Sequence, residues 1–312
     1  MNAALAAGLV LLAGLSLLVG AAGFGVPDGI ILWQLRMPRT GLALVIGAGL
    51  GLSGAVLQGA LRNPLADPGL LGIGGAAALG GVVVFYWGLS AAFAPALVLG
   101  GLAGAAAGCG ALLAFAGRAP SGPAVILGGI AVSSLAAALL ALALTLAPNP
   151  FALAEIAFWL MGGLEDRTLT HLAIAGPLIL IGLGILLRLG PSLDALGLGE
   201  ATAASLGRPA SRTLIWTALG VTLAVGPGAA VAGGIGFVGL VVPHLLRPWC
   251  GQAPSRVLGA SALAGAMLVL GADILARAGP LLLPLQAEPR LGVLTALLGT
   301  PVLIALSRQV RA

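Results

Sequence analysis

The chain has 312 residues, of which 60% are hydrophobic and only 7% are charged, and its formal net charge is +5. This composition excludes a water-soluble globular domain and indicates a protein of the lipid bilayer. All 14 basic residues are arginines. A P-loop needs a lysine on the nucleotide phosphates and Schiff-base catalysis needs a lysine amine, so the chain can perform neither. If ATP drives this protein, another subunit must hydrolyse it.

The apolar stretches are long enough to cross a membrane repeatedly, since about 20 helical residues span the hydrocarbon core. The first stretch is expected to be a retained helix, because it lacks the positive start of a secretory signal. The eighth contains Pro243 and is too short to cross alone, so it is either a broken helix or the end of a longer one. The ten predicted spans are 3–23, 40–61, 69–89, 92–117, 123–147, 171–189, 213–230, 235–247, 257–277 and 291–308.

These spans predict an all-α, polytopic membrane protein with about ten transmembrane helices in a single domain, residues 1–312. Nine of the 14 arginines fall on the side of the two termini and five on the other side, which places both termini in the cytoplasm. The arginines are scattered between apolar runs, so they form no basic patch for nucleic acid. The tryptophans agree with the span ends, where an indole is favoured: Trp33, Trp87, Trp159, Trp216 and Trp249.

Two glycine patterns are interpreted as packing features. Small residues repeat every four positions at Gly100, Gly104 and Gly108, which lets a neighbouring helix approach closely. A G-x-G-x-x-G string at residues 234–239 lacks the preceding strand and the following acidic residue of a dinucleotide site. It is interpreted instead as a break between two membrane helices.

A set of short sequence motifs in a fixed order identifies a protein family far more specifically than composition does. The strings are RMPRT (36–40), GLSGAVLQ (51–58), RNPLADPGLLG (62–72), FWLMGG (158–163), LGLGE (196–200), GIGFVGLVVPHLLR (234–247), GADILAR (271–277) and GVLTALLGTP (292–301). Together they closely resemble the FecCD-like family, the permease subunits of bacterial ABC importers for iron chelates, haem and cobalamin. One departure is Glu288-Pro289-Arg290, where the family more often has Glu-Leu-Pro, which predicts a differently shaped entry to the last span.

The resemblance implies a permease of the bacterial inner membrane, surrounded by lipid, that forms a homodimer around a central path. Two copies of a cytoplasmic ATP-binding subunit and a periplasmic substrate-binding protein are the implied partners. The cargo would be an iron(III)-siderophore, haem or cobalamin, with an iron-siderophore as the first expectation. No cofactor is expected, and the chain itself is expected not to be an enzyme.

At the outer mouth, Arg36 and Arg39 lie three residues apart, so both guanidiniums can pair with carboxylates of a docking protein. In the similar permeases these positions and Arg277 meet acidic residues of the binding protein. The alternatives are lipid anchoring or an internal ion pair, for which Asp273 is well placed four residues before Arg277.

At the inner face, the 190–212 segment is the longest and most polar loop and is expected to contain short helices. By resemblance it is the element that couples to the ATPase, through Gly199, Glu200, Ala201, Leu206 and Gly207. The alternative is a plain solvated connector, although so much alanine and leucine would leave apolar surface exposed.

The resemblance also implies a constriction of the path at its inner end. Its residues would be Asn63 and Leu65, where Pro64 ends the second span, together with Ser121 and Gly122. A simple helix-ending turn is the alternative.

Two other classes of function were weighed. A secondary transporter needs ion-coupling groups near the midplane, and membrane carboxylates are scarce here. A membrane scaffold without a path is the second alternative.

No cluster has metal-ligand spacing, and no nucleophile with a base is present. Cys109 and Cys250 form neither a disulfide framework nor a CxxC pair.

Overall fold

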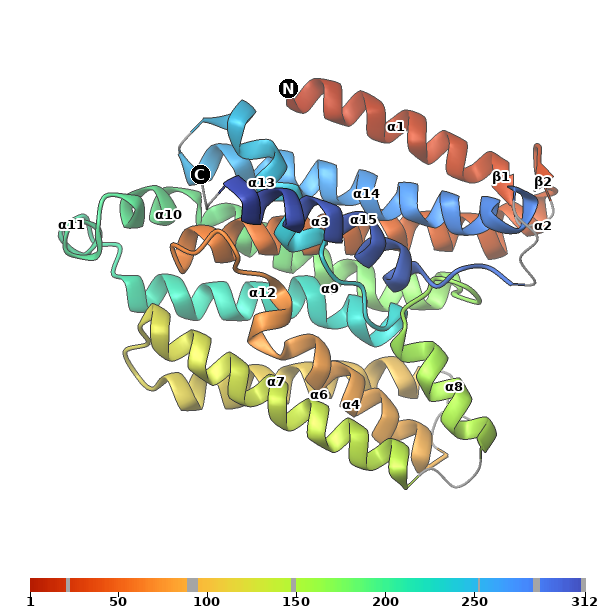
Figure 1. The fold of residues 1–312 in the computed structure, drawn as a ribbon, viewed down its shortest axis with the longest axis horizontal. Coiled ribbons are helices and arrows are strands. Elements are labelled where there is room, and N and C mark those ends of the chain that lie inside the picture. Colours follow the sequence, from red (N-terminus) through yellow and green to blue (C-terminus); the bar gives the residue numbers. More distant parts are fainter. Residues whose placement is uncertain (21–22, 89–94, 147–149, 252, 283–286, 310–312) are drawn as a thin grey trace.

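The chain forms one bundle of helices in a computed structural model, which describes all residues except 21–22, 89–94, 147–149, 252, 283–286 and 310–312 (Figure 1). The first half contains α1 (Asn2–Leu18), β1 (Val19–Gly20), β2 (Gly23–Phe24), α2 (Gly29–Ile31), η1 (Leu32–Arg36), α3 (Met37–Ala60), η2 (Pro68–Leu71), α4 (Ile73–Tyr86), α6 (Ala96–Ala116) and α7 (Gly122–Thr145). The second half contains α8 (Pro150–Leu160), α9 (Leu169–Arg188), α10 (Gly190–Gly197), α11 (Glu200–Ser205), α12 (Ala210–Ala232), α13 (Val238–Cys250), α14 (Pro254–Leu282) and α15 (Leu291–Gln309).

Each predicted span coincides with a helix, so the all-α polytopic class is confirmed. Within the described residues, six helices are long and apolar enough to cross a membrane, and three shorter apolar helices accompany them. The eighth span is α13, which has only 13 residues and contains Pro243. Because α13 is so short, the number of ten crossings is approximate.

The helix at the centre of the bundle is α3. It belongs to the helical stretch Gly29–Ala60, in which 78% of the most hydrophobic 18-residue segment is buried. Its glycines allow backbones to touch: a Cβ on Gly54 would overlap the Gly239 carbonyl of α13, and one on Gly51 would overlap the Ser261 carbonyl of α14. Such close approach gives apolar helices extensive van der Waals contact, which drives their association in lipid. As a result, α3 packs against four helices, α9, α12, α13 and α14.

A second group consists of α4, α6 and α7, which Figure 1 shows on one side of the bundle. The predicted small-residue face of α6 is confirmed as a packing surface. A Cβ on Gly104 would overlap the Ala76 carbonyl of α4, and one on Gly108 would lie 2.6 Å from the Ala76 Cβ. The 4-residue spacing therefore sets how closely α4 and α6 approach.

The G-x-G-x-x-G segment is a break between two helices, as predicted. It connects α12 to α13 through residues 233–237, which are not helical. Gly233 has a φ of 71° and Phe237 a φ of 68°. Positive φ angles at both ends interrupt the helix, at a conformational cost that only the glycine avoids.

The two ends of the bundle carry different elements (Figure 1). One end holds α10 and α11, and α15 runs toward this end. The opposite end holds the β1–β2 hairpin, α2 and α8. Below, these are called the α10–α11 end and the hairpin end.

Candidate functional site

A network of charged side chains lies at the hairpin end, beside the start of α3. Arg39 Nε donates to Asp273 Oδ1 at 2.7 Å, and its Nη2 donates to Glu288 Oε2 at 2.7 Å. Arg277 Nη2 lies 2.9 Å from Asp273 Oδ2, an ion pair that does not meet hydrogen-bond geometry, and Asp273 is fully buried. The network joins α3 to α14 and to the chain just before α15, so it fixes three elements at this end.

Arg277 belongs to the interior of this network. It is 2% exposed, and its Nη1 donates to the carbonyls of Ser16 and Val19 at 2.7 Å each. A guanidinium covered in this way cannot reach a partner's carboxylate. The structure therefore favours the alternative of an internal ion pair with Asp273, and Arg277 is not included in the docking surface proposed below.

The other two predicted docking residues are only partly enclosed. Arg36 Nη1 donates to the carbonyls of Leu17 at 2.5 Å and Gly25 at 3.1 Å, which ties the end of α1 to η1. Arg39 is 13% exposed at its side chain, with its two carboxylate partners described above. Both arginines therefore hold the hairpin end together, and both are partly buried.

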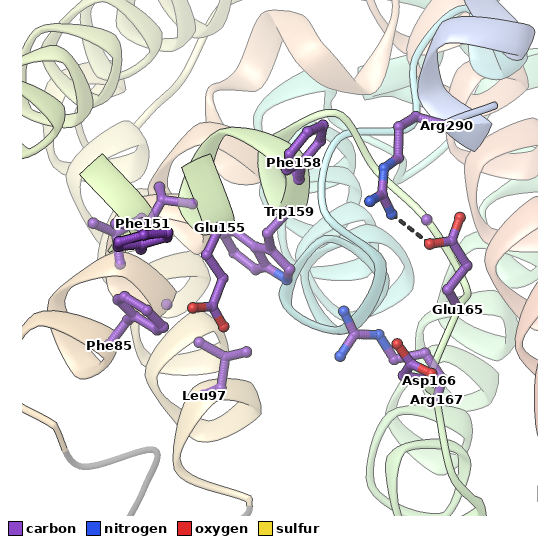
Figure 2. Close-up of a pocket in the computed structure, with 14 residues that line it drawn as sticks. Phe85, Leu97, Phe151, Glu155, Phe158, Trp159, Glu165, Asp166, Arg167 and Arg290 are labelled. Atoms are coloured by element: carbon purple, nitrogen blue, oxygen red, sulfur yellow. Dashed lines mark hydrogen bonds and ion pairs between the residues drawn. The ribbon is translucent and has the colours of Figure 1, made fainter. Parts of the chain in front are cut away.

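An open cavity of about 660 Å³ also lies at this end, and Figure 2 shows the residues that line it. Aromatic rings form one wall, Phe85 from α4 and Phe151 from α8. Trp159 Nε1 and Arg167 Nε are buried and have no hydrogen-bond partner among the described residues. Both side chains line the cavity, but these two covered donor atoms are not accessible to an outside molecule in this conformation.

A second ion pair borders the same cavity. Arg290 Nη1 donates to Glu165 Oε2 at 2.6 Å, and the Arg290 guanidinium lies 5.1 Å from the centre of the Phe158 ring (Figure 2). Burial raises the pKa of Glu165 while the charge of Arg290 lowers it. Burial lowers the pKa of Arg167, against the nearby charges of Asp166 and Glu165. The unusual Glu288-Pro289-Arg290 string therefore supplies an arginine to this cavity and a glutamate to the adjacent network.

Sequence reasoning did not assign Glu165, Arg167 or Trp159 to a site. The FWLMGG string drew attention to Trp159, but Glu165 and Arg167 lie in the short segment between α8 and α9, which matches none of the strings. Their only signal was a group of charges between apolar runs.

At the opposite end, the 190–212 segment forms two short helices, as predicted. Leu193 and Leu196 of α10 are at most 2% exposed, so α10 is anchored in the bundle. Gly199 and Gly207 have φ angles of 108° and 73° and lie just before and after α11. Only glycine takes these angles without strain, so the pair fixes α11 as a separate projecting helix.

The predicted coupling residues lie on this projecting helix and its flanks. Glu200, Ala201 and Leu206 are exposed, and the neighbouring Leu198 is 70% exposed. Glu200 Oε1 accepts from Arg62 Nη2 at 2.6 Å, and both side chains are 54% exposed. The start of α11 is thus paired with the residue that follows α3.

The predicted constriction residues lie at the same end. Asn63 Oδ1 accepts from the Leu65 backbone at 2.9 Å, and Leu65 is 56% exposed. Ser121 caps α7 through the Ala124 backbone, and a Cβ on Gly122 would lie 4.0 Å from Leu61 Cδ2. The structure therefore brings the loop after α3 close to the start of α7, and both are beside the Arg62–Glu200 pair.

One face of α7 is largely free of contacts, since only 28% of its most hydrophobic 18-residue segment is buried. That face carries two adjacent stripes. One consists of leucines, namely Leu135, Leu139, Leu142 and Leu146. The other is small or polar and consists of Ala131, Ser134, Ala138, Ala141 and Thr145. Hydroxyl groups along a membrane face are more compatible with a partner or water than with lipid tails.

These features define a class: a polytopic permease with a projecting element at one end and a charged mouth at the other, of the kind found in ABC importers. The comparisons with known proteins agree. Residues 6–309 match the model of the FecCD transport family, and the chain belongs to that family. The predicted resemblance is confirmed.

Curated relatives include vitamin B12 import system permease proteins named BtuC. The Klebsiella pneumoniae protein is 38% identical over 279 residues, covering 88% of this chain and 81% of the relative. The Salmonella typhimurium protein is 40% identical over 280 residues, covering 88% of this chain and 82% of the relative. This chain is thus part of a bacterial ABC importer of the inner membrane, whose partners are an ATPase and a substrate-binding protein.

Solved structures give the same fold. A structure described as an inward-facing metal-chelate type ABC transporter matches with a TM-score of 0.88 and 32% identity, covering 99% of this chain and 98% of that one. PsaBC from Streptococcus pneumoniae in complex with Fab matches with a TM-score of 0.55 and 15% identity, which is a likeness of fold alone.

Proposed function

We propose that two copies of this chain form the path of an ATP-driven importer for cobalamin or a related metal chelate. In this proposal the α10–α11 end and both termini face the cytoplasm. The observation that carries it is the Arg62–Glu200 ion pair, because it joins the projecting helix α11 to the loop that contains Asn63 and Leu65. A partner that moves α11 would therefore move the proposed inner constriction.

Each part of the mechanism is assigned to a described element. ATPase subunits would bind the exposed surface of α11 and its glycine flanks. The exposed stripes of α7 would meet the second copy and the cargo, since a small and weakly polar wall suits a large organic complex. The cavity bordered by the partly exposed Arg290 would receive acceptor groups of the cargo or its binding protein.

The named relatives set the order of cargo tests. Vitamin B12 permeases align over most of the chain, so cobalamin is proposed ahead of the iron-siderophore that the sequence first suggested. Proteoliposomes holding the permease, its ATPase and the loaded binding protein should accumulate cobalamin only with ATP inside. Uptake of a ferric siderophore in its place would correct the cargo while leaving the importer proposal intact. Uptake driven by an ion gradient without the ATPase would overturn the proposal.

The ion-gradient alternative is not favoured by the buried charges. Among the described residues, Asp273 and Arg277 are the buried charged residues. Asp273 is held by two arginines, so it is not available to bind a coupling ion. A secondary transporter needs such a group near the midplane.

Docking of the binding protein is proposed at Arg36 and Arg39, without Arg277. Arg36→Gln is expected to weaken capture of the loaded binding protein about 1.4- to fivefold at low salt, because one surface ion pair contributes roughly 0.2–1 kcal/mol. Surface plasmon resonance at two salt concentrations would measure it, since a rim charge acts through the association rate.

Arg118→Gln at the α10–α11 end is the matched control and should not change this affinity. Arg36 also holds two backbone carbonyls, so the thermal stability of each variant must be compared. An unchanged affinity at low salt, with normal stability, would remove Arg36 from the docking surface.

A further inference from the structure

A small basic cavity at the α10–α11 end borders the proposed coupling surface at Leu206 and Gly207, but its arginines have no role in the mechanism above. Its volume is about 320 Å³, and it lies where α9, α10 and α12 meet. The residues that line it are Leu189, Ser192, Leu206, Gly207, Arg208, Pro209, Arg212, Thr213 and Trp216. Two of them are arginines and none is acidic.

The two arginines are not neutralised by the acidic residues of the same segment. Arg208 Nη1 donates to Ser192 Oγ at 3.0 Å, and no ion pair involves Arg208 or Arg212 in the described parts of the chain. Asp194 instead accepts from the Ser255 backbone at 2.9 Å, and Glu200 is paired with Arg62. The cavity therefore presents two uncompensated positive charges beside a hydroxyl group.

The order of side chains along α12 matches the layers of a membrane surface. Arg208 and Arg212 are exposed around the start of α12, and Trp216 lies one turn further in and is 43% exposed. An indole is favoured at the headgroup level, with arginine on its aqueous side. Leu189, just after α9, lines the cavity, and Leu187 in the last turn of α9 is 48% exposed.

We infer that this cavity binds the phosphate headgroup of an anionic phospholipid. Arg208, Arg212 and the Ser192 hydroxyl would hold the phosphate oxygens, since guanidinium groups match phosphate geometry. Trp216 would cover the glycerol region, and the acyl chains would follow α9 and α12. Basic pockets between membrane helices are suited to such headgroups, and a volume of about 320 Å³ admits a headgroup but no large ligand.

A lipid bound in this cavity would contact the junction between α11 and α12, which matters for the importer. The cavity includes Leu206 and Gly207, which immediately follow α11. A bound headgroup would hold the junction of α11 and α12 in place. The inference goes beyond the proposed function, because it requires neither the cargo nor the ATPase.

The test is native mass spectrometry of the purified permease after incubation with phosphatidylglycerol or phosphatidylcholine. The wild type should retain phosphatidylglycerol preferentially. The double variant Arg208→Gln/Arg212→Gln should retain it roughly thirtyfold less, because each arginine near an anionic lipid contributes about 1 kcal/mol. Arg118→Gln/Arg256→Gln removes two exposed arginines elsewhere and should retain lipid like the wild type.

Further arms distinguish the other occupants. Arg208→Lys/Arg212→Lys keeps both charges and should keep most of the retention, which guards against misfolding of the glutamine variant. Inorganic phosphate in excess should not displace the lipid; displacement would assign the cavity to a free phosphate. Loss of ATPase binding in the glutamine variant, with lipid retention unchanged, would assign it to the ATPase. Equal loss of lipid in the control and the glutamine variant would also overturn the inference.

Discussion

Asp273→Ala is expected to lower the free energy of unfolding by about 3–5 kcal/mol, the range for breaking one side of a buried ion pair. Asp273 is fully buried and is the carboxylate shared by Arg39 and Arg277. Its removal leaves Arg277, which is only 2% exposed, without a counter-charge. The penalty arises because a buried charge without a partner has lost its hydration.

The measurement is unfolding of the purified permease in detergent, followed by circular dichroism. Glu288→Ala is the matched control, because Glu288 also pairs with Arg39 but its side chain is 16% exposed, so water can replace it. Asp273→Asn should fall between the two, since an amide can still accept from Arg39. Equal stability of the Asp273 and Glu288 variants would show that burial does not set the cost.

Glu200→Arg is expected to uncouple ATP hydrolysis from transport while leaving the fold intact. The change places two positive charges together at Arg62 and reverses the charge presented by α11. Both side chains are 54% exposed, so the loss in stability should be below about 1 kcal/mol. A coupling free energy of roughly 1–3 kcal/mol would lower transport per ATP about 5- to 150-fold.

ATPase rate and cargo uptake would be measured on the same proteoliposomes. Arg256→Glu is the control, because it reverses an exposed charge near the start of α14 at a residue with no proposed role and should leave coupling unchanged. The charge swap Arg62→Glu/Glu200→Arg should recover part of the transport if the ion pair itself carries the movement. Normal transport per ATP in the single variant would end the proposed role of this contact.

The helices and the family could be predicted from the sequence for a local reason. A membrane span needs about 20 apolar residues with all backbone groups bonded internally. That requirement is satisfied within each segment, so it leaves a readable signature in composition. The break at residues 233–237 was also local, since glycine clusters and Pro243 stand beside it in the chain.

The charged network at the mouth could be predicted only in part. Asp273 and Arg277 are four residues apart on one helix, so their pairing was foreseen as an alternative. Arg39 is 234 residues from Asp273, and no sequence pattern joins them. Their contact depends on how close α3 and α14 approach, which the glycines of α3 control.

The sequence by itself determined that this chain is a lysine-free, polytopic FecCD-family helix bundle whose 190–212 segment projects as short helices. Only the tertiary structure decided which arginines are free. It buried Arg277, paired Arg39 and Arg62, and left Arg208 and Arg212 beside a cavity with no counter-charge from the residues that the structure describes. The physical reason is that pairing of charges depends on distances of a few ångströms between helices far apart in sequence, whereas insertion into lipid depends on each segment alone.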